Sequence, residues 1–466
     1  MKQKYKILFI TYTHSNGGGA ENVLTTLVNN LDPDHYAIDI IEVVQFLVRK
    51  EPLNKNIRLL SPMIKAENKI FESTIYHILY EKPEIIKPLF RLYGYDVIIT
   101  WNYQLPSFCL RSFKNEIKIA WFHGAIYDFL PDAIDARPEH HKQLQLKTWE
   151  TADRIVTISE KSLQSLKDIF PELAFKAEII HNGFDFSKIQ RLSIKNSEIT
   201  IPTDIKNIII GVGRFDKNKN FELLIRAVSR VIHSGTNCFL IILGHGELLS
   251  ALEEIAVKEK IKDFVLFAGY QQNPYPYFKL SKIVCLTSFS EGWPTVIIEG
   301  MFLGKPFVTT PVAGASEELS DNGKCGLVSD WNIEEYAACI RKLLTDQNLY
   351  NKMSENCKEK VKQFSVENTT VQFDVLIEKL YDTYVLNKKK QSKNDRIQAI
   401  YHFACIYSSI NIKDTQLLFA YNRYKNNKSL INIIKLIYRL TLTIINCFLF
   451  PFRFCTGFVS GCFLGV

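Results

Sequence analysis

The stretch NIIIGVGRFDKNKNFELLIRAVSRVI (residues 207–232) contains the pattern that decides the fold. It begins with a fully apolar run, passes through a glycine-containing turn and ends with apolar residues at helical spacing. A short apolar run of this kind indicates a strand that is buried on both faces, as in a parallel sheet covered by helices. The stretch therefore predicts one β-α unit of an α/β domain.

The same alternation of strands and helices continues on both sides of this stretch. Toward the C-terminus we expect a helix at residues 247–259 and strands within residues 238–246, 264–269, 282–288 and 306–310. Toward the N-terminus we expect a helix at residues 22–31 and strands within residues 6–11, 36–44, 96–100, 117–123, 154–159 and 177–183. Two parallel α/β sheets in tandem follow from this order.

Polar, proline-containing sequence around residues 185–205 separates the two sets and is the predicted linker. We therefore predict an N-terminal domain at residues 1–190 and a C-terminal domain at residues 191–375. Residues 376–466 are predicted to form a crossover helix and a tail that is basic and then strongly apolar.

The tail bears on where the protein acts. The chain of 466 residues has a formal net charge of +8. Its positive charge gathers late in the sequence, which favours a local anionic surface, such as a membrane, over a nucleic-acid partner. The apolar run is interrupted by Lys435, Arg439 and Arg453 and broken by Pro451. It predicts an interfacial helix or a re-entrant segment rather than a full span; the alternative is that the tail packs on the body of the protein.

The ten cysteines stand singly, without a C-x-x-C pair. This spacing argues against a disulfide framework or a zinc ribbon and favours a reducing, cytoplasmic compartment. Cys285, inside IVCLTS, is predicted to be a small buried apolar residue. The N-terminal apolar run is short and leads into a glycine turn, so we expect a buried strand there and not a signal peptide.

The strongest candidate site lies in SFSEGWPTVIIEGMFLGKP (residues 288–306). Pro294 suits the first position of a helix, which places Glu299 within its first turns and Glu291 in the preceding loop. The free N–H groups at a helix start can hold a diphosphate. Because carboxylates repel phosphates, the two glutamates are expected to bind hydroxyls, such as those of a ribose.

A second candidate site lies in the turn after the apolar run of residues 207–232. Arg214 and Lys219 follow that strand directly. Two cations at this place could hold a diphosphate and stabilise the charge that develops as it leaves.

The segment from Glu291 to Glu299 resembles the E-x7-E motif of the large retaining glycosyltransferase family 4, within the glycosyl transferases group 1. The stretch GRFDKNKNFELLIRA resembles the Arg/Lys phosphate-binding motif of that family, and GGGAENVLTTLVNNL resembles its acceptor-side glycine loop. HNGFD and PVAGASEELSDNGKCGLV also match in order and spacing. The resemblance covers about residues 5–380. One departure is GHGEL (residues 244–248), which lacks the proline common in the family.

The resemblance implies a GT-B fold, in which two Rossmann-like domains face each other across a cleft. It implies no metal and no cofactor, and a same-face attack in which the leaving phosphate helps to deprotonate the acceptor. The implied roles are sugar contact for Glu291, a place near the reacting sugar for His123, ribose binding for Glu299, a diphosphate clamp for Arg214 and Lys219, and donor contacts for Gly18, Gly19, Thr295 and Val296.

Two other features have plainer explanations. Asp32–Asp34 (DPD) follows a predicted helix, so a helix-ending turn is favoured over a metal site. His140 and His141 are adjacent and cannot form an i, i+4 metal pair, so both are predicted to lie on a surface helix.

Three functions remain open from the sequence. The first is a retaining glycosyltransferase that uses a nucleotide sugar, a UDP-sugar in preference to a GDP-sugar. Its acceptor would be a glycan or a polyprenyl-diphosphate-linked sugar in cell-surface polysaccharide or lipopolysaccharide assembly, at the inner face of the cytoplasmic membrane. The second is a sugar-nucleotide epimerase with the same fold. The third is a non-catalytic protein that binds sugar nucleotides or a membrane surface.

Overall fold

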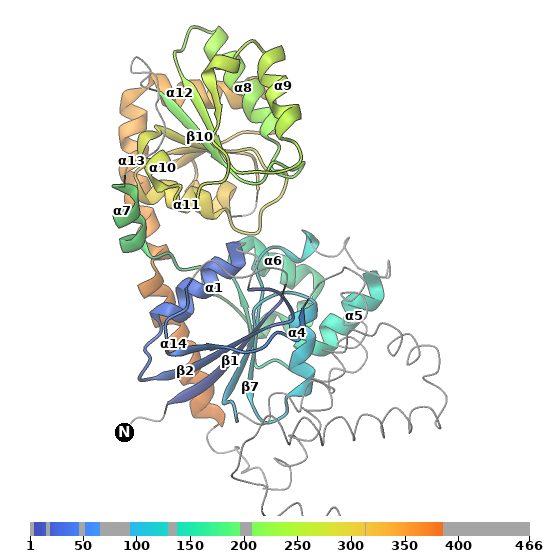
Figure 1. Ribbon diagram of the computed structural model, residues 1–466. Coiled ribbons are helices and arrows are strands. Elements are labelled where there is room, and N and C mark those ends of the chain that lie inside the picture. The colour runs from blue at the N-terminus through green and yellow to red at the C-terminus, as the bar shows by residue number, and fades with distance from the viewer. Residues whose placement is uncertain are drawn as a thin grey trace, which may run out of the picture.

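The computed structural model describes residues 4–14, 19–45, 52–65, 94–128, 138–195, 207–312 and 314–384. These residues form two parallel α/β domains, one above the other in Figure 1. The predicted membrane-associating tail lies outside the described residues. Among the helices that the structure describes, none combines the length and apolar character needed to cross a membrane.

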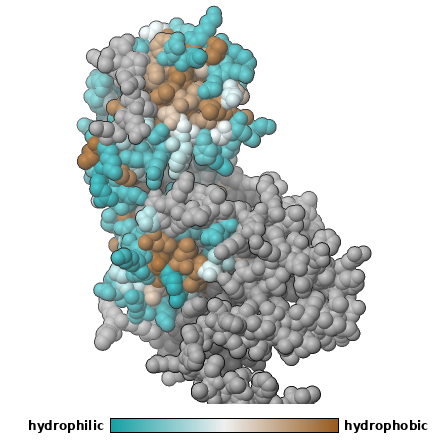
Figure 2. All heavy atoms as spheres, viewed as in Figure 1, coloured by the Kyte–Doolittle hydropathy of each residue, from teal (hydrophilic) through white to brown (hydrophobic). Residues whose placement is uncertain are grey.

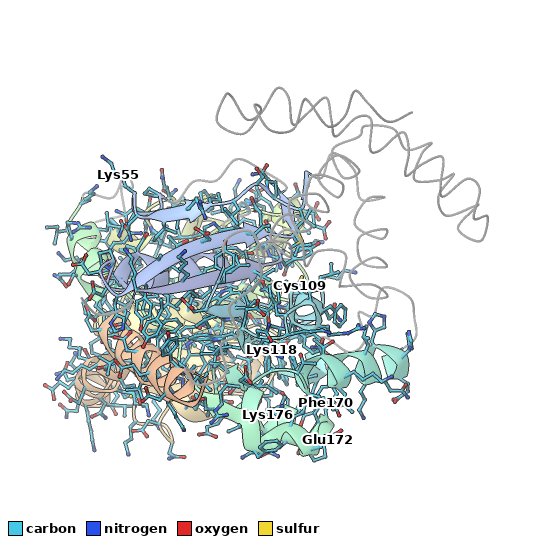
Figure 3. All side chains as sticks on the ribbon, turned by 90° about the horizontal axis from the view of Figure 1, so that it is seen from below. Lys55, Cys109, Lys118, Phe170, Glu172 and Lys176 are labelled. Carbon is cyan, nitrogen blue, oxygen red and sulfur yellow. The ribbon has the colours of Figure 1, made fainter. Side chains whose placement is uncertain are left out.

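In the described part of the N-terminal domain, seven strands form a sheet in the order β4-β2-β1-β6-β7-β8-β9, with every pair parallel. Its strands are β1 (Tyr5–Thr11), β2 (Tyr36–Glu42), β4 (Ile57–Leu59), β6 (Val97–Thr100), β7 (Ile117–Trp121), β8 (Arg154–Thr157) and β9 (Ala177–Ile179). The helices α1 (Gly19–Asn30), α4 (Leu105–Phe108), α5 (Pro138–Trp149) and α6 (Glu160–Ile169) accompany them, and β3 (Val44–Gln45) pairs with β5 (Ile64–Lys65). Seen from below, Cys109 lies inside this domain and Glu172 at its surface (Figure 3).

The C-terminal domain contains a six-stranded parallel sheet in the order β12-β11-β10-β13-β14-β15. Its strands are β10 (Ile208–Val212), β11 (Phe239–Leu243), β12 (Val265–Phe267), β13 (Ile283–Leu286), β14 (Phe307–Thr309) and β15 (Gly326–Val328). Its helices are α8 (Phe221–His233), α9 (Leu249–Lys258), α10 (Tyr275–Leu280), α11 (Thr295–Phe302), α12 (Ile333–Thr345) and α13 (Gln347–Lys360).

The strand order of the C-terminal sheet indicates the edge at which a ligand would bind. The chain runs outward from β10 through β11 to β12 and then returns to add β13 on the other side of β10. In such sheets ligands bind beyond the carboxyl ends of the strands, at the point where the order reverses. The loops after β10 and β13 are therefore neighbours, and they carry Arg214 and Lys219 in one case and Glu291 in the other.

The predicted linker contains a short helix, α7 (Phe186–Ser193). Asp185 caps it, because its Oδ1 accepts a hydrogen bond of 2.7 Å from the backbone N–H of Lys188. The helix packs against α10, and its Ile189 is 3% exposed. The helix is only eight residues long, which is shorter than the window over which hydrophobic periodicity identifies a helix.

Helix α14 (Val366–Tyr384) carries the chain from the C-terminal domain back along the N-terminal domain (Figure 1). Phe373 is fully buried there, with its ring 6.3 Å from that of Phe9 and 5.7 Å from that of Tyr36. Within the described residues the chain crosses between the domains before α7 and again before α14, and these two crossings are hydrogen-bonded to each other. Phe184 N–H donates to the carbonyl of Phe364 at 2.9 Å, and Val366 N–H donates to the carbonyl of Phe184 at 3.0 Å.

Replacing Tyr36 with phenylalanine is expected to lower the free energy of unfolding by about 1–2 kcal/mol. The Tyr36 hydroxyl is buried and donates to Asp374 Oδ1 on α14 at 2.6 Å, and burial together with Asp374 raises the pKa of Tyr36. Urea denaturation measures the change. Tyr127→Phe is the matched control, because its hydroxyl bonds to Asp168 at an exposed site where water can replace it. Equal losses for the two variants would contradict this prediction.

Three single-residue predictions can be compared with the structure. Cys285 is 1% exposed, as predicted. Asp32–Asp34 forms a turn in which Asp34 N–H donates to Asp32 Oδ1 at 2.9 Å, also as predicted. The surface position predicted for His141 is wrong, since it is 3% exposed while His140 is exposed. Successive residues on a helix point about 100° apart, so one of two adjacent histidines can face the core.

Candidate active site

The loop between β13 and α11 holds the centre of the candidate site. α11 begins at Thr295, and Pro294 is its N-cap residue, one position earlier than predicted. Trp293 anchors this loop, because it is 6% exposed and its ring stacks on that of His181 at 5.3 Å. The loop is therefore held at the boundary between the two domains.

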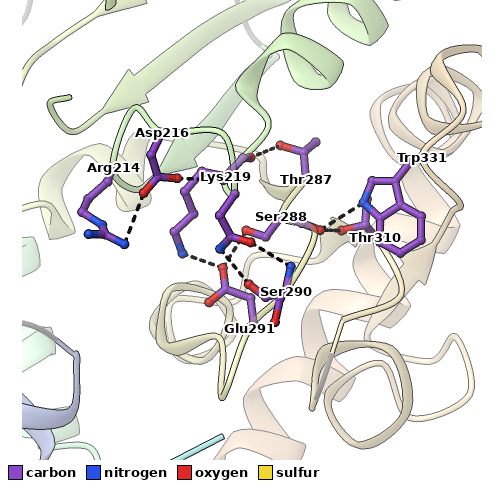
Figure 4. Close-up of polar contacts among 10 residues, drawn as sticks. Arg214, Asp216, Lys219, Thr287, Ser288, Ser290, Glu291, Thr310 and Trp331 are labelled. Carbon is purple, nitrogen blue, oxygen red and sulfur yellow. Dashed lines mark hydrogen bonds and ion pairs between the residues drawn. The ribbon is translucent and has the colours of Figure 1, made fainter. Parts of the chain in front are cut away.

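Lys219 and Glu291 form an ion pair with Nζ and Oε1 2.5 Å apart. Three further contacts fix the pair (Figure 4). Ser288 Oγ donates to Glu291 Oε1 at 2.6 Å, Asp216 Oδ1 accepts from Lys219 N–H at 3.0 Å, and Thr287 Oγ1 donates to the Lys219 carbonyl at 2.9 Å. The two side chains are 20% and 13% exposed. An anionic ligand at this place would meet a lysine that is already fixed in position.

Arg214 lies on the same turn and is far more exposed. Its Nη2 is 3.2 Å from Asp216 Oδ2, and its side chain is 76% exposed. Gly213 allows Lys219 to lie close to the backbone, since a Cβ at Gly213 would be 3.2 Å from Lys219 Cγ and Cδ. The turn thus offers one fixed cation and one that is free to move toward an anion.

A pocket of about 120 Å³ lies between the two domains. It is lined by α1, α7, α10, α11 and the crossing segment before α7, with the residues Gly19, Asn22, Val23, Thr26, Gly183, Phe184, Asp185, Lys188, Ile189, Tyr275, Thr295 and Glu299. On the left-hand side of the domain boundary in the space-filling view, the exposed residues are mainly hydrophilic (Figure 2). Glu299 is the carboxylate that α11 contributes to this pocket.

Glu299 has an unusual electrostatic environment. Burial raises the pKa of Glu299 to about 7, and a hydrogen bond from the Tyr275 hydroxyl to Oε1, at 3.2 Å, acts in the opposite direction. A carboxyl group with this pKa changes its charge near neutral pH. Perturbed carboxyl groups in pockets are frequent at functional sites.

Replacing Glu299 with glutamine is expected to stabilise the protein at pH 8 by about 1–3 kcal/mol and to have little effect at pH 4.5. The pKa of Glu299 is raised on folding, so its contribution to stability is fully present below its ordinary pKa and is lost as the pH rises through about 7. Thermal unfolding at the two pH values measures the difference. The exposed Glu253→Gln on α9 is the control. A Glu299→Gln variant that is destabilised at pH 8 would contradict the expectation.

His123 follows β7 and lies close to the Glu291 loop. A Cβ at Gly292 would be 3.0 Å from Gly124 Cα and 3.4 Å from the His123 carbonyl oxygen, so the loops of the two domains touch here. The His123 ring lies 4.6 Å from that of Trp101. Neither of its ring nitrogens has a hydrogen bond of normal geometry among the described residues. Burial lowers the pKa of His123 to about 3, opposed by the nearby Asn182, so the ring is neutral near pH 7.

The structure separates the predicted site residues into two groups. Lys219 and Glu291 are in direct contact, Arg214 shares their turn, and His123 lies on the loop that meets theirs. Gly19, Thr295 and Glu299 line the interdomain pocket. Val296 instead packs against the hydrophobic core, and Gly18 lies outside the described residues. The sequence did not reveal Tyr275 or Lys188, because they reach the pocket from α10 and α7, which carry no motif. Asp185 also lines the pocket; it lies in the HNGFD motif, but the sequence assigned it no role.

This arrangement defines a class of protein. Two parallel-sheet domains that place polar side chains beyond the carboxyl ends of their strands, with a pocket between them, form the GT-B fold. The predicted fold class is therefore confirmed by the architecture, and comparison with known structures agrees. The sucrose-phosphate synthase of Thermosynechococcus elongatus superposes with a TM-score of 0.65 at 18% identity, covering 82% of this chain and all of that one.

Known sequences resemble part of the chain. The family model described as Glycosyl transferases group 1 matches residues 195–360. An N-acetylgalactosamine-N,N'-diacetylbacillosaminyl-diphospho-undecaprenol 4-alpha-N-acetylgalactosaminyltransferase of Campylobacter jejuni is 30% identical over 46% of this chain and 56% of its own length. A second protein of that organism, named as an alpha-1,4-N-acetyl-D-galactosaminyltransferase for a diNAcBac-PP-undecaprenol-linked glycan, is 25% identical over 78% of this chain and 95% of its own.

Residues 195–360 of the chain thus match the group 1 glycosyltransferases, in agreement with the motifs. The chain spans little more than half of the first C. jejuni relative. Assignment to family 4 in particular stays a prediction from the motifs.

Proposed function

We propose that the chain is a retaining glycosyltransferase that moves a sugar from a nucleotide diphosphate sugar to a lipid-linked glycan. The observation that carries this proposal is the convergence of Arg214, Lys219 and Glu291 at the carboxyl ends of two adjacent strands, against the His123 loop. Two cations at this edge would hold the diphosphate of the donor. They would also stabilise the negative charge that grows on the leaving group.

The remaining groups fit the other parts of such a donor. The Glu299 carboxylate would accept hydrogen bonds from the ribose hydroxyls, and Thr295 at the start of α11 lies on the same pocket wall. Glu291 would contact the transferred sugar. His123, which is neutral and has no well-formed hydrogen bond, could donate one to a sugar hydroxyl. Because Lys219 and Arg214 supply positive charge, no metal ion is required in this account.

The proposed reaction keeps the configuration at the anomeric carbon. The bond from this carbon to the diphosphate oxygen breaks as the acceptor hydroxyl attacks from the same face. The acceptor oxygen forms the new glycosidic bond, and its proton passes to the departing diphosphate. No protein nucleophile takes part. The reaction therefore depends on positioning and on electrostatic stabilisation of the leaving group.

The acceptor class comes from the relatives. Both C. jejuni relatives carry names that describe transfer of N-acetylgalactosamine to glycans on an undecaprenol diphosphate. A polyprenyl-diphosphate-linked glycan is therefore the proposed acceptor, with a UDP-sugar as donor, in the assembly of a cell-surface polysaccharide. Such an acceptor would place the enzyme at the inner face of the cytoplasmic membrane, where the basic, apolar tail would contact anionic lipid.

A donor screen tests the proposal. The purified chain is incubated with UDP- and GDP-sugars and with polyprenyl-diphosphate-linked glycans, with and without EDTA, and released nucleoside diphosphate is measured. We expect turnover that depends on the acceptor and persists in EDTA, and an α-linked product by NMR from an α-linked donor. Incorporation of solvent deuterium into the sugar ring without acceptor would instead identify an epimerase. Donor binding with no turnover on any acceptor would identify a binding protein.

A further inference from the structure

Tyr275 reaches the interdomain pocket from a helix that carries no recognised motif. It is the first residue of α10, and its backbone N–H donates to Asn273 Oδ1 at 3.4 Å. Asn273 is itself fixed, because its Nδ2 donates to the Leu192 carbonyl of α7 at 3.0 Å. The start of α10 is thus tied to the linker helix, and the tyrosine is held in the pocket wall.

The Tyr275 hydroxyl approaches the one carboxylate that α11 contributes to the pocket. It donates to Glu299 Oε1 at 3.2 Å. A single hydrogen bond to one carboxylate oxygen restricts rotation of the carboxylate plane and leaves the other oxygen to a ligand. Thr295 lies one helical turn before Glu299 on the same wall. The two α11 side chains and Tyr275 therefore line one corner of the pocket.

We propose that Tyr275 is a positioning residue for donor binding: its hydroxyl orients the Glu299 carboxylate, so that the carboxylate can accept hydrogen bonds from the ribose hydroxyls of the donor. This inference rests on the proposed function. The inference adds to the proposed function that a residue of α10, a helix outside the sequence motifs, sets the geometry of the ribose site.

The electrostatics of the pocket give the proposal a pH signature. Burial raises the pKa of Glu299 to about 7, and the hydrogen bond from Tyr275 lowers it. Removing the hydroxyl is therefore expected to move the pKa of Glu299 further upward. Among the described residues, the other charged side chains that line this pocket are Asp185 and Lys188, from the linker side. A limb of the pH profile near neutral pH is assigned to Glu299 if it disappears in Glu299→Gln.

Tyr275→Phe tests the inference. We expect the KM for the donor at pH 7 to rise about 10-fold, with kcat changed less than about 3-fold, because the lost hydrogen bond serves donor binding. The acid limb of kcat/KM is expected to shift to higher pH. Tyr277→Phe is the matched control, since it removes a hydroxyl from the same helix at a residue outside the pocket wall. Its donor KM and pH profile should match the wild type.

Two further measurements separate the possible outcomes. In a Glu299→Gln background, Tyr275→Phe should produce no additional shift of the acid limb, because glutamine does not titrate. NMR titration of the Glu299 carboxyl carbon in the free protein requires no turnover, and in Tyr275→Phe its midpoint should move upward. An unchanged midpoint, or an equal KM effect in the Glu299→Gln background, would overturn the inference. If the wild type shows no turnover but the Glu299 midpoint still moves upward in Tyr275→Phe, the result would count against the proposed function alone.

Discussion

Replacing Lys219 with methionine is expected to lower kcat/KM by about 100- to 1000-fold, the effect of removing one preorganised group that stabilises transition-state charge. Glu291 holds the Nζ of Lys219 in place. Asp216 and Thr287 hold the backbone of Lys219. The positive charge is therefore in position before the donor binds. Methionine keeps the apolar stem of the side chain and removes the charge. The loss should fall mainly on kcat, because negative charge accumulates on the diphosphate as it leaves.

Steady-state kinetics of released nucleoside diphosphate measures this effect. Lys217→Met is the matched control, since Lys217 is a lysine on the same turn whose side chain is exposed. Its kcat/KM should stay within about 2-fold of the wild type, as for surface changes away from a site. Circular dichroism would exclude unfolding. A Lys219→Met variant with near wild-type kcat would remove Lys219 from the mechanism.

Replacing Gly244 with alanine is expected to destabilise the C-terminal domain by about 3 kcal/mol or more. Gly244 has φ of 144°, and a Cβ there would lie 1.8 Å from the carbonyl oxygen of Gly213 and 2.9 Å from its carbonyl carbon. These are backbone atoms, which cannot rotate away as a side chain could. The turn that carries Arg214 would have to move, so donor binding should be lost together with stability.

Gly235→Ala separates the strain of a positive φ from the clash with the backbone of Gly213. Gly235 also has a positive φ, of 88°, but nothing lies within 4 Å of the position of an added Cβ. It should therefore lose only about 1 kcal/mol from backbone strain. Urea denaturation measures the free energy of unfolding of both variants. Calorimetric binding of a nucleoside diphosphate shows whether the turn that carries Arg214 is intact. Similar losses for Gly244→Ala and Gly235→Ala would mean that the close approach to Gly213 is unimportant.

Much of the fold could be predicted because its central strands are continuous apolar runs. β10 is buried on both faces, and its continuous apolar sequence made the strand recognisable. β4 was not, because only its first residue, Ile57, is buried and the next two are exposed. α7 was missed because, at eight residues, it is too short to show a convincing helical period. Hydrophobic pattern therefore finds the buried centre of each sheet and misses short edge strands and surface helices.

The candidate site divides in the same way. The meeting of Lys219 with Glu291 follows from strand order, since each residue lies just after one of two adjacent central strands. The pocket around Glu299 joins segments that carry motifs with two helices, α7 and α10, that carry none. It brings together α1, α7, α10 and α11, which are far apart in the sequence, and Tyr275 owes its place there to the contact between α10 and α7.

The return of α14 to the N-terminal domain has a consequence for dividing the protein. Fragments cut between the two sheets would not be two autonomous folding units, because the first would lack Phe373 and the neighbouring side chains that fill its interior. The second would keep that helix with its apolar side uncovered. A split protein should therefore reassemble only when residues 366–384 reach the first fragment, either supplied in trans as a peptide or grafted onto its end.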